Sequence, residues 1–212
     1  FVYEAKDGML DKFEKAAEKK TKMFNKEEGS TMLTYRILTG NNSGAYERYL
    51  VGQSAASYDL DRSDELEYWS KNVMPYAEAV GGQMRWQWEE WGTVGEESQP
   101  PRYLNKTIFR YKPDMEAHVA RLIYRWGKVW EKRNPNAFRR LFSPVSGGDL
   151  NAFVSFSGFD EYGDAPRNEN TWEEDYNEMF GWEQYAQDQK MMQKALRAVS
   201  YTHLRAHETF TD

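Results

Sequence analysis

The amino-acid sequence predicts an α+β fold made of two tandem β-α-β-β-α-β units. Residues 3–9 align with residues 109–115, and the same order of elements follows each segment. The offset between these segments recurs far along the chain, where Gly40 in one turn aligns with Ser146 in another. Repetition at a fixed interval indicates a duplicated structural unit.

Hydrophobic periodicity places the elements of the first unit. Side chains alternate in the expected strands, whereas the expected helices carry apolar residues every three or four positions. Ser63 suits the N-cap of the second helix, and Pro75 predicts either a bend or an early break in that helix. Residues 40–44 suit a five-residue hairpin loop. The expected segments are strand 1–6, a helix from Met9 to Gly29, strands 32–39 and 45–53, a helix from Ser63 to Val80, and strand 84–89.

A polar, proline-containing stretch at residues 95–102 is interpreted as the linker. After it the order of elements starts again, and a capping box of Thr171 and Glu174 opens one last long helix. The other expected segments of this unit are strand 103–111, a helix from Asp114 to Asn134, and strands 136–143 and 151–158. The resulting domains are 1–94 for the first unit, 95–102 for the linker, 103–198 for the second unit and 199–212 for a tail.

The tail is expected to be foreign to the protein. Residues 200–209 resemble the translation of a sequencing adapter, so residues 199–212 are interpreted as an artefact. The pair His203 and His207 is therefore not interpreted as a zinc site, and the fourth strand of the second unit, expected just after Ala198, is predicted to be missing. The chain also starts without methionine, so an upstream segment is expected to have been lost. The sequence therefore does not decide the cellular compartment.

Composition excludes several classes of function. A net charge of −6 argues against a nucleic-acid partner, because such proteins need a basic surface to neutralise phosphates. The absence of cysteine excludes disulfides and thiolate chemistry. No apolar run approaches the roughly 20 residues of a membrane span. No metal or other cofactor is expected, and an oligomer is compatible with the sequence.

The β-α-β-β-α-β order is that of the ferredoxin-like motif. Two such units in tandem resemble the dimeric α+β barrel superfamily in a fused form. The resemblance implies two four-stranded antiparallel sheets around a lumen, with helices outside and ligands inside. Its members include monooxygenases of antibiotic biosynthesis, haem enzymes and stress-responsive barrels. No catalytic motif of these families is found, so any function taken from the resemblance rests on the fold alone.

The first hairpin supplies the main candidate site. If Thr39 pairs with Ala45, then Arg36 faces Arg48 on the same side of the sheet, together with Tyr46. Opposed like charges are destabilising unless an anion lies between them. Because the other side is more apolar and should pack on the helices, both arginines are expected in the lumen. A ligand carboxylate or phosphate would satisfy them; the alternative is that Glu4 or Glu89 does so.

The second hairpin and one histidine supply weaker candidates. Arg140 is expected on the lumen side of its strand, if the offset between the repeats holds. His118 is the haem ligand that the resemblance would suggest, although its place beside the apolar stripe of its helix favours a surface histidine. The tryptophans Trp86 and Trp126 are interpreted as core.

Three functions follow, in order of preference. The first is a barrel that binds a small anionic or aromatic molecule in the lumen through Arg36, Arg48, Tyr46 and Arg140. The second is a cofactor-independent monooxygenase or isomerase-like enzyme, in which a tyrosine or carboxylate moves a proton. The third is a haem enzyme that uses His118.

Overall fold

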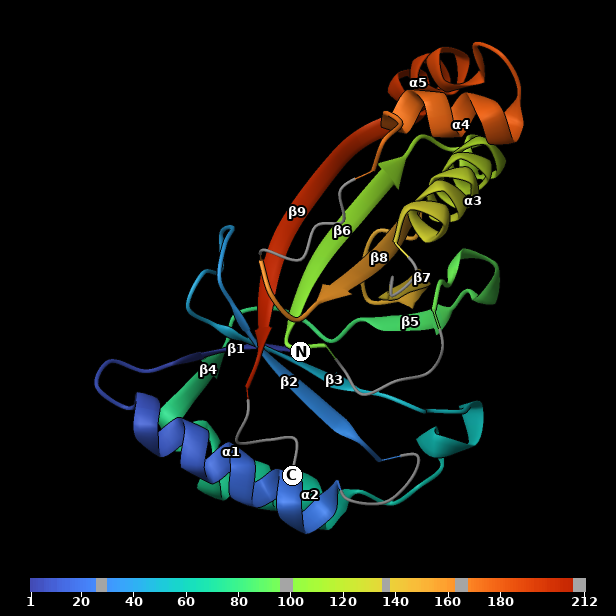
Figure 1. Cartoon of the computed structure of the whole chain (residues 1–212). Helices are drawn as coiled ribbons and strands as arrows, with labels where there is room; N and C mark the ends of the chain where they lie inside the picture. The colour runs from blue at the N-terminus through green and yellow to red at the C-terminus, as the bar shows by residue number, and fades with distance from the viewer. Residues whose placement is uncertain (26–29, 96–100, 135–137, 163–167, 208–212) are drawn as a thin grey trace. The chain divides into compact units, whose positions relative to one another are not determined.

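The computed structural model describes residues 1–25, 30–95, 101–134, 138–162 and 168–207 (Figure 1). The chain forms two compact units. Unit 1 contains Phe1–Gln83 and the segment that starts at Leu204, and unit 2 contains Met84–His203. The predicted fold class is confirmed, because each half of the sequence combines antiparallel strands and helices in the expected order.

Unit 1 places two helices on one face of its sheet. Phe13 and Ala17, one helical turn apart, are fully buried and pack against Tyr46 and Val73. Figure 1 shows the two helices side by side along this face. The elements are β1 (Val2–Ala5), α1 (Leu10–Phe24), β2 (Met32–Ile37), β3 (Tyr46–Leu50), η1 (Ala55–Tyr58), α2 (Ser63–Asn72), η2 (Met74–Tyr76) and β4 (Ala77–Ala79). The strand order is β4-β1-β3-β2.

The second helix of unit 1 breaks early near Pro75, which is one of the two outcomes predicted for this proline. Helix α2 ends at Asn72, and a short 3-10 turn follows. Residues 77–79 then form β4, which pairs with β1. Proline lacks the amide hydrogen that an α-helix needs and clashes with the preceding turn, so the chain leaves the helix there.

Unit 2 carries three helices on one face of a longer sheet. Its strand order is β9-β6-β8-β7-β5. The core between helices and sheet is made of fully or nearly fully buried apolar residues: Phe109, Val119, Leu122, Ile123, Leu141, Phe153, Met192 and Ala195. The elements are β5 (Arg85–Trp88), η3 (Glu90–Gly92), β6 (Tyr103–Tyr111), α3 (Glu116–Arg133), β7 (Phe138–Ser146), β8 (Ala152–Phe159), α4 (Trp172–Phe180), α5 (Gln184–Ala195) and β9 (Leu196–Ala206).

Each sheet takes an edge strand from the other half of the sequence. Strand β5, expected to close the first unit, instead pairs with β7, with Trp88 opposite Phe142. Conversely, the end of β9 pairs with β2, with Leu204 opposite Ile37. The compact units therefore divide the chain after residues 83 and 203 rather than at the linker. The tandem repeat remains a prediction, which the matching element order supports.

The missing last strand was a wrong expectation. Residues 196–206 form β9, and Leu204 in it is fully buried. Val199, Tyr201 and Thr202 are residue types that favour strands, so the chain continues in extended form past Ala198. The adapter-like origin of residues 199–212 stays a prediction, because strand formation does not depend on where these residues come from.

The predicted capping box is present, but it opens a shorter helix. Thr171 Oγ1 accepts a hydrogen bond from the Glu174 amide at 3.2 Å, and the Thr171 amide donates to Glu174 Oε2 at 2.6 Å. The chain then breaks at Gly181, where φ is 112°, and Glu183 is left-handed at φ 57°. Glycine adopts positive φ without strain, so it ends α4 and lets α5 start in a new direction.

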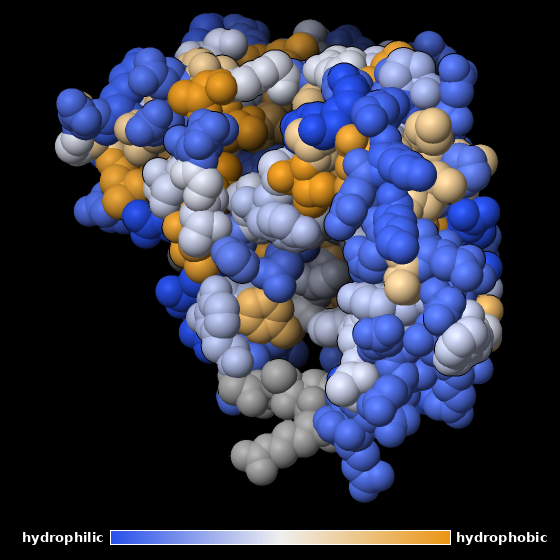
Figure 2. Space-filling model, turned by 90° about the horizontal axis from the view of Figure 1, so that it is seen from above, coloured by the Kyte–Doolittle hydropathy of each residue, from blue (hydrophilic) through white to orange (hydrophobic). Residues whose placement is uncertain are grey.

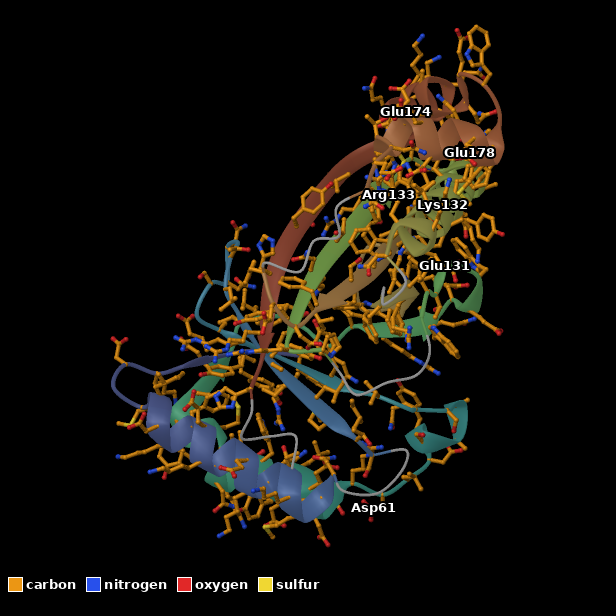
Figure 3. All side chains as sticks on the ribbon, viewed as in Figure 1. Asp61, Glu131, Lys132, Arg133, Glu174 and Glu178 are labelled. Atoms are coloured by element: carbon orange, nitrogen blue, oxygen red, sulfur yellow. The ribbon has the colours of Figure 1, made fainter. Side chains whose placement is uncertain are left out.

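Ion pairs join α4 to the end of α3. Figure 3 labels Lys132 and Arg133 of α3 and Glu178 of α4. Lys132 Nζ lies 2.9 Å from Asp175 and 2.7 Å from Glu178, and Arg133 Nη1 lies 2.5 Å from Asp175. Hydrogen bonds from Lys132, and then from Asn170 and Arg133, lower the pKa of Asp175. This carboxylate is buried yet stays charged, because it has three donors.

The surface drawn in Figure 2 is mostly hydrophilic, with scattered apolar patches. Within the described residues, no helix combines the length and the apolar character that a membrane crossing requires.

Candidate functional site

The first hairpin is paired two residues away from the predicted register. Ile37 and Ala45 close the loop, so residues 38–44 form it instead of the predicted five. As a result Arg36 faces Tyr46, and Arg48 faces Thr34. The expected opposition of Arg36 and Arg48 is wrong. A register shift of two residues leaves every side chain on its predicted side of the sheet. The residues expected to share a side therefore still do so.

The assignment of these two sides to helices and lumen was also wrong. We call the side that packs on the helices the helix face and the other the opposite face. Arg48 lies on the helix face, where it donates to Thr21 Oγ1 at 2.5 Å and to Thr34 Oγ1 at 3.2 Å. Its guanidinium also lies 4.8 Å from the Trp69 ring centre. Burial lowers the pKa of Arg48 to about 10.

Arg48 belongs to a buried polar cluster between α1, α2 and the sheet. Lys20, which is 3% exposed, forms an ion pair with Glu65 and donates to Asn25 Oδ1 at 2.6 Å. Burial lowers the pKa of Lys20 to about 8, partly opposed by the hydrogen bond to Glu65. Hydroxyl, amide, carboxylate and indole groups thus make the burial of two cations tolerable.

The other predicted residues of the first hairpin do not form an anion site. Arg36 is exposed. The hydroxyl of Tyr46 donates to Glu14 of α1, and its ring packs edge-on against Phe13 at 5.3 Å. Burial and this hydrogen bond raise the pKa of Tyr46. His207 Nε2 lies 3.0 Å from the same Glu14 carboxylate. Tyr46 is therefore held by the helix rather than presented to a ligand.

Arg140 lies on the opposite face of unit 2, on the side predicted for it. Its Nη1 donates to the carbonyls of Val94 at 2.9 Å and Arg139 at 3.0 Å, and its guanidinium stacks 4.4 Å from the Phe138 ring. Arg139 has the opposite orientation: it donates to Ser155 Oγ and to the carbonyl of Ile123 in α3. Both arginines thus have structural partners.

An aromatic cluster with a buried lysine occupies the same opposite face of unit 2. Lys106 is 8% exposed, and its Nζ lies 4.9 Å from the Trp86 ring and 6.0 Å from the Phe156 ring. Phe142 completes the cluster, 6.3 Å from Trp86 and 5.7 Å from Phe156. We call these four residues the Lys106 cluster. It combines stacking surfaces with one positive charge.

Sequence reasoning missed the Lys106 cluster, although a signal existed. Lys106 stands between Leu104 and Ile108 on one side of its strand, so a charge interrupts an apolar row. Trp86 was interpreted as core, and it is half-buried within the cluster. Its neighbours Phe142 and Phe156 could not be assigned to it, because the pairing of β5 with β7 was not foreseen.

The opposite face of unit 1 carries two tyrosines and a carboxylate. Tyr35 lies directly across from Glu47, and its ring is 6.0 Å from that of Tyr49. Burial raises the pKa of Tyr35 to about 12, and burial with the adjacent Glu47 raises that of Tyr49. Among the described residues, the Tyr35 hydroxyl has no hydrogen-bond partner, although the residue is 2% exposed. We call these three residues the Tyr35 cluster.

The structure does not fit His118 as a haem ligand. The residue is half-buried on α3, and its Nδ1 lies 3.5 Å from the guanidinium of Arg121. His118 thus lies on the side of a helix next to a positive charge. These surroundings lack the enclosed apolar pocket that a haem needs around its iron. Within the part of the chain that the structure describes, no group of three His, Asp or Glu residues is placed to hold a metal ion.

The chain combines antiparallel strands and helices in an α+β fold, which solved structures share. No family profile and no curated protein sequence matches the chain. A candidate monooxygenase from Fusobacterium nucleatum subsp. nucleatum ATCC 25586 superposes with a TM-score of 0.58 at 13% identity, over 97% of this chain and 90% of that one.

Two further structures have the same fold. A candidate chlorite dismutase gives a TM-score of 0.56 at 12% identity, over 99% of this chain and 94% of that one. A candidate monooxygenase from Lactobacillus acidophilus NCFM gives 0.54 at 10% identity, over 97% and 91%. The likeness confirms that the chain shares the α+β fold of these structures. At such low identity the likeness concerns the fold alone.

Proposed function

We propose that the protein binds a small aromatic anion at the Lys106 cluster. The observation that carries the proposal is a nearly buried ammonium group among three aromatic rings. A ligand carboxylate would form a charge-assisted hydrogen bond with this ammonium group. The rings of Trp86, Phe142 and Phe156 offer offset or edge-to-face contacts to an aromatic ligand.

This site replaces the arginine pair as the place for the anion. Arg48 already has two hydroxyl partners and an indole, and Arg140 is bound to backbone carbonyls. The resemblance described from the sequence leads us to expect ligands on the side of the sheet away from the helices. The position of the Lys106 cluster on that side of unit 2 supports the proposal. Binding of a small anionic or aromatic ligand thus remains the preferred function. The proposed site is now the Lys106 cluster instead of the predicted arginines.

The charge of Lys106 provides the test. Isothermal titration of the protein with salicylate is expected to show saturable binding that Lys106→Met weakens about tenfold, because one charged hydrogen bond contributes about 1.5 kcal/mol or more. Lys194→Met is the matched control, since Lys194 is exposed in α5. Equal affinity in both variants, or no saturable binding to the unaltered protein, would contradict the proposal.

The second candidate function is a cofactor-independent oxygenase at the Tyr35 cluster. The observation that favours it is a buried carboxylate across from a buried phenol without a hydrogen-bond partner among the described residues. Glu47 would accept a proton from an electron-rich phenol, and the phenolate would react with oxygen. A phenol and one O₂ then give a quinone and one water, so the substrate supplies all the electrons.

Oxygen uptake tests this second candidate. With an electron-rich phenol, the unaltered protein is expected to consume oxygen, and Glu47→Gln is expected to lower the rate at least about a hundredfold, as removal of a general base commonly does. Glu78→Gln is the control, because Glu78 is exposed on β4. Uptake that does not differ between the two variants would exclude Glu47 as the base.

A further inference from the structure

A pocket of about 640 Å³ opens on the helix face of unit 2. It lies between the start of α3, the short turn η3, the end of β6 and the start of β8. Its walls include Glu89, Trp91, Tyr111, Glu116 and Phe153. It is separate from the Lys106 cluster, which occupies the other face of the same sheet.

Three aromatic rings form one continuous wall of this pocket. The Trp91 and Phe153 rings are perpendicular, with centres 5.6 Å apart, and the Phe153 and Tyr111 ring centres are 5.4 Å apart. Trp91 is 37% exposed at the mouth, whereas Phe153 and Tyr111 are 3% and 4% exposed. The faces of such rings carry negative potential and attract cations that come within about 6 Å.

The charges of the lining residues have one sign. Glu89, Asp114 and Glu116 contribute carboxylates, and no lysine, arginine or histidine is among the residues that line the pocket in the described part of the chain. Glu116 and Asp114 also offset the partial positive charge at the start of α3. The pocket therefore disfavours anions and favours a positively charged ligand.

Hydrogen bonds hold one carboxylate and one ring in place. Glu89 Oε1 accepts from Ser143 Oγ at 2.5 Å, and Glu89 Oε2 accepts from Trp91 Nε1 at 2.8 Å. The carboxylate is thus fixed beside the tryptophan ring before any ligand arrives. A site whose groups are already oriented loses less conformational entropy on binding.

Tyr111 contributes a phenol to the lining of the pocket, and the residue as a whole is 4% exposed. Burial, and then the nearby Glu116, Asp149 and Glu89, raise the pKa of Tyr111 to about 12. The phenol stays neutral at physiological pH, so its oxygen can accept a hydrogen bond or contact a cation.

We propose that this pocket binds a small organic cation with a methylated or alkyl ammonium head group. Aromatic faces and carboxylates together recognise such a group, whereas an uncharged ligand would leave the carboxylates uncompensated. A metal ion is a poorer fit, because the described residues contain no group of three acidic or histidine ligands. The proposal does not depend on the function proposed for the Lys106 cluster.

Calorimetric titration with choline tests the proposal, with its uncharged isostere 3,3-dimethylbutan-1-ol as the second probe. Choline is expected to bind saturably, and the alcohol at least about tenfold more weakly, because only the cation gains from the rings and carboxylates. Trp91→Leu is expected to weaken choline binding about fivefold or more. The matched control is Trp182→Leu, since Trp182 is 84% exposed and lies outside the pocket.

Glu89→Gln removes the negative charge of one pocket carboxylate with almost no change in the shape of the side chain. It is expected to weaken choline binding, while circular dichroism shows the fold of each variant. The proposal is overturned if choline does not bind saturably, if the alcohol binds equally well, or if Trp91→Leu and Trp182→Leu behave alike. Tyr111→Phe removes one oxygen atom only and is expected to lower the affinity for choline more than that for the alcohol.

Discussion

Replacing Glu65 with leucine is expected to lower the free energy of unfolding of unit 1 by about 3 kcal/mol, because it leaves buried cations without their carboxylate. Glu65 pairs with Lys20 and accepts a hydrogen bond from Asn25. Lys20 and Arg48 are each 3% exposed, so water cannot replace the lost partner. Urea denaturation followed by far-ultraviolet circular dichroism measures the change.

A double variant separates loss of charge from loss of packing. Lys20→Met combined with Glu65→Leu removes both members of the pair, and such replacements by apolar residues are often neutral or stabilising. The double variant is therefore expected to be more stable than Glu65→Leu alone. If it is less stable than the single variant, the carboxylate does not compensate Lys20, and the cluster has another basis.

Replacing Leu122 with alanine is expected to cost about 3 kcal/mol of unfolding free energy, since it opens a cavity in the core of unit 2. Leu122 of α3 is fully buried within the cluster that contains Phe109, Leu141 and Phe153. The side chain has no polar atom, so the effect reports packing alone. Denaturant unfolding detects the change.

Leu150→Ala is the matched control for Leu122→Ala. Leu150 is 56% exposed in the turn between β7 and β8, so the same substitution there is expected to change stability by less than about 0.5 kcal/mol. Equal losses at the two positions would mean that α3 does not pack on the sheet as described.

Local patterns predicted most of the elements correctly. The alternation of residues 103–111 predicted β6, the spacing of apolar residues predicted α1 and α3, and Thr171 with Glu174 predicted a helix start. The two sides of each hairpin were also divided correctly. These signals depend on neighbours within a few positions, which a sequence shows directly.

Features that depend on distant residues could not be predicted in the same way. The pairing of β5 with β7 joins segments from different halves of the chain, and the loop at residues 38–44 shifted the register by two. Arg48 was assigned to the wrong side, because apolarity suggested that Tyr35 and Ile37 face the helices. The partners that stabilise its charge, Thr21 and Trp69, become neighbours only in the folded chain.

The most direct test of the proposed ligand site observes Lys106 itself. In a protein with ¹³C-labelled lysine Cε positions, assigned by comparison with Lys106→Met, salicylate is expected to shift the Lys106 resonance saturably and to leave that of Lys194 in place. A Lys106 resonance that does not move while salicylate binds would place the ligand elsewhere and contradict the proposed site.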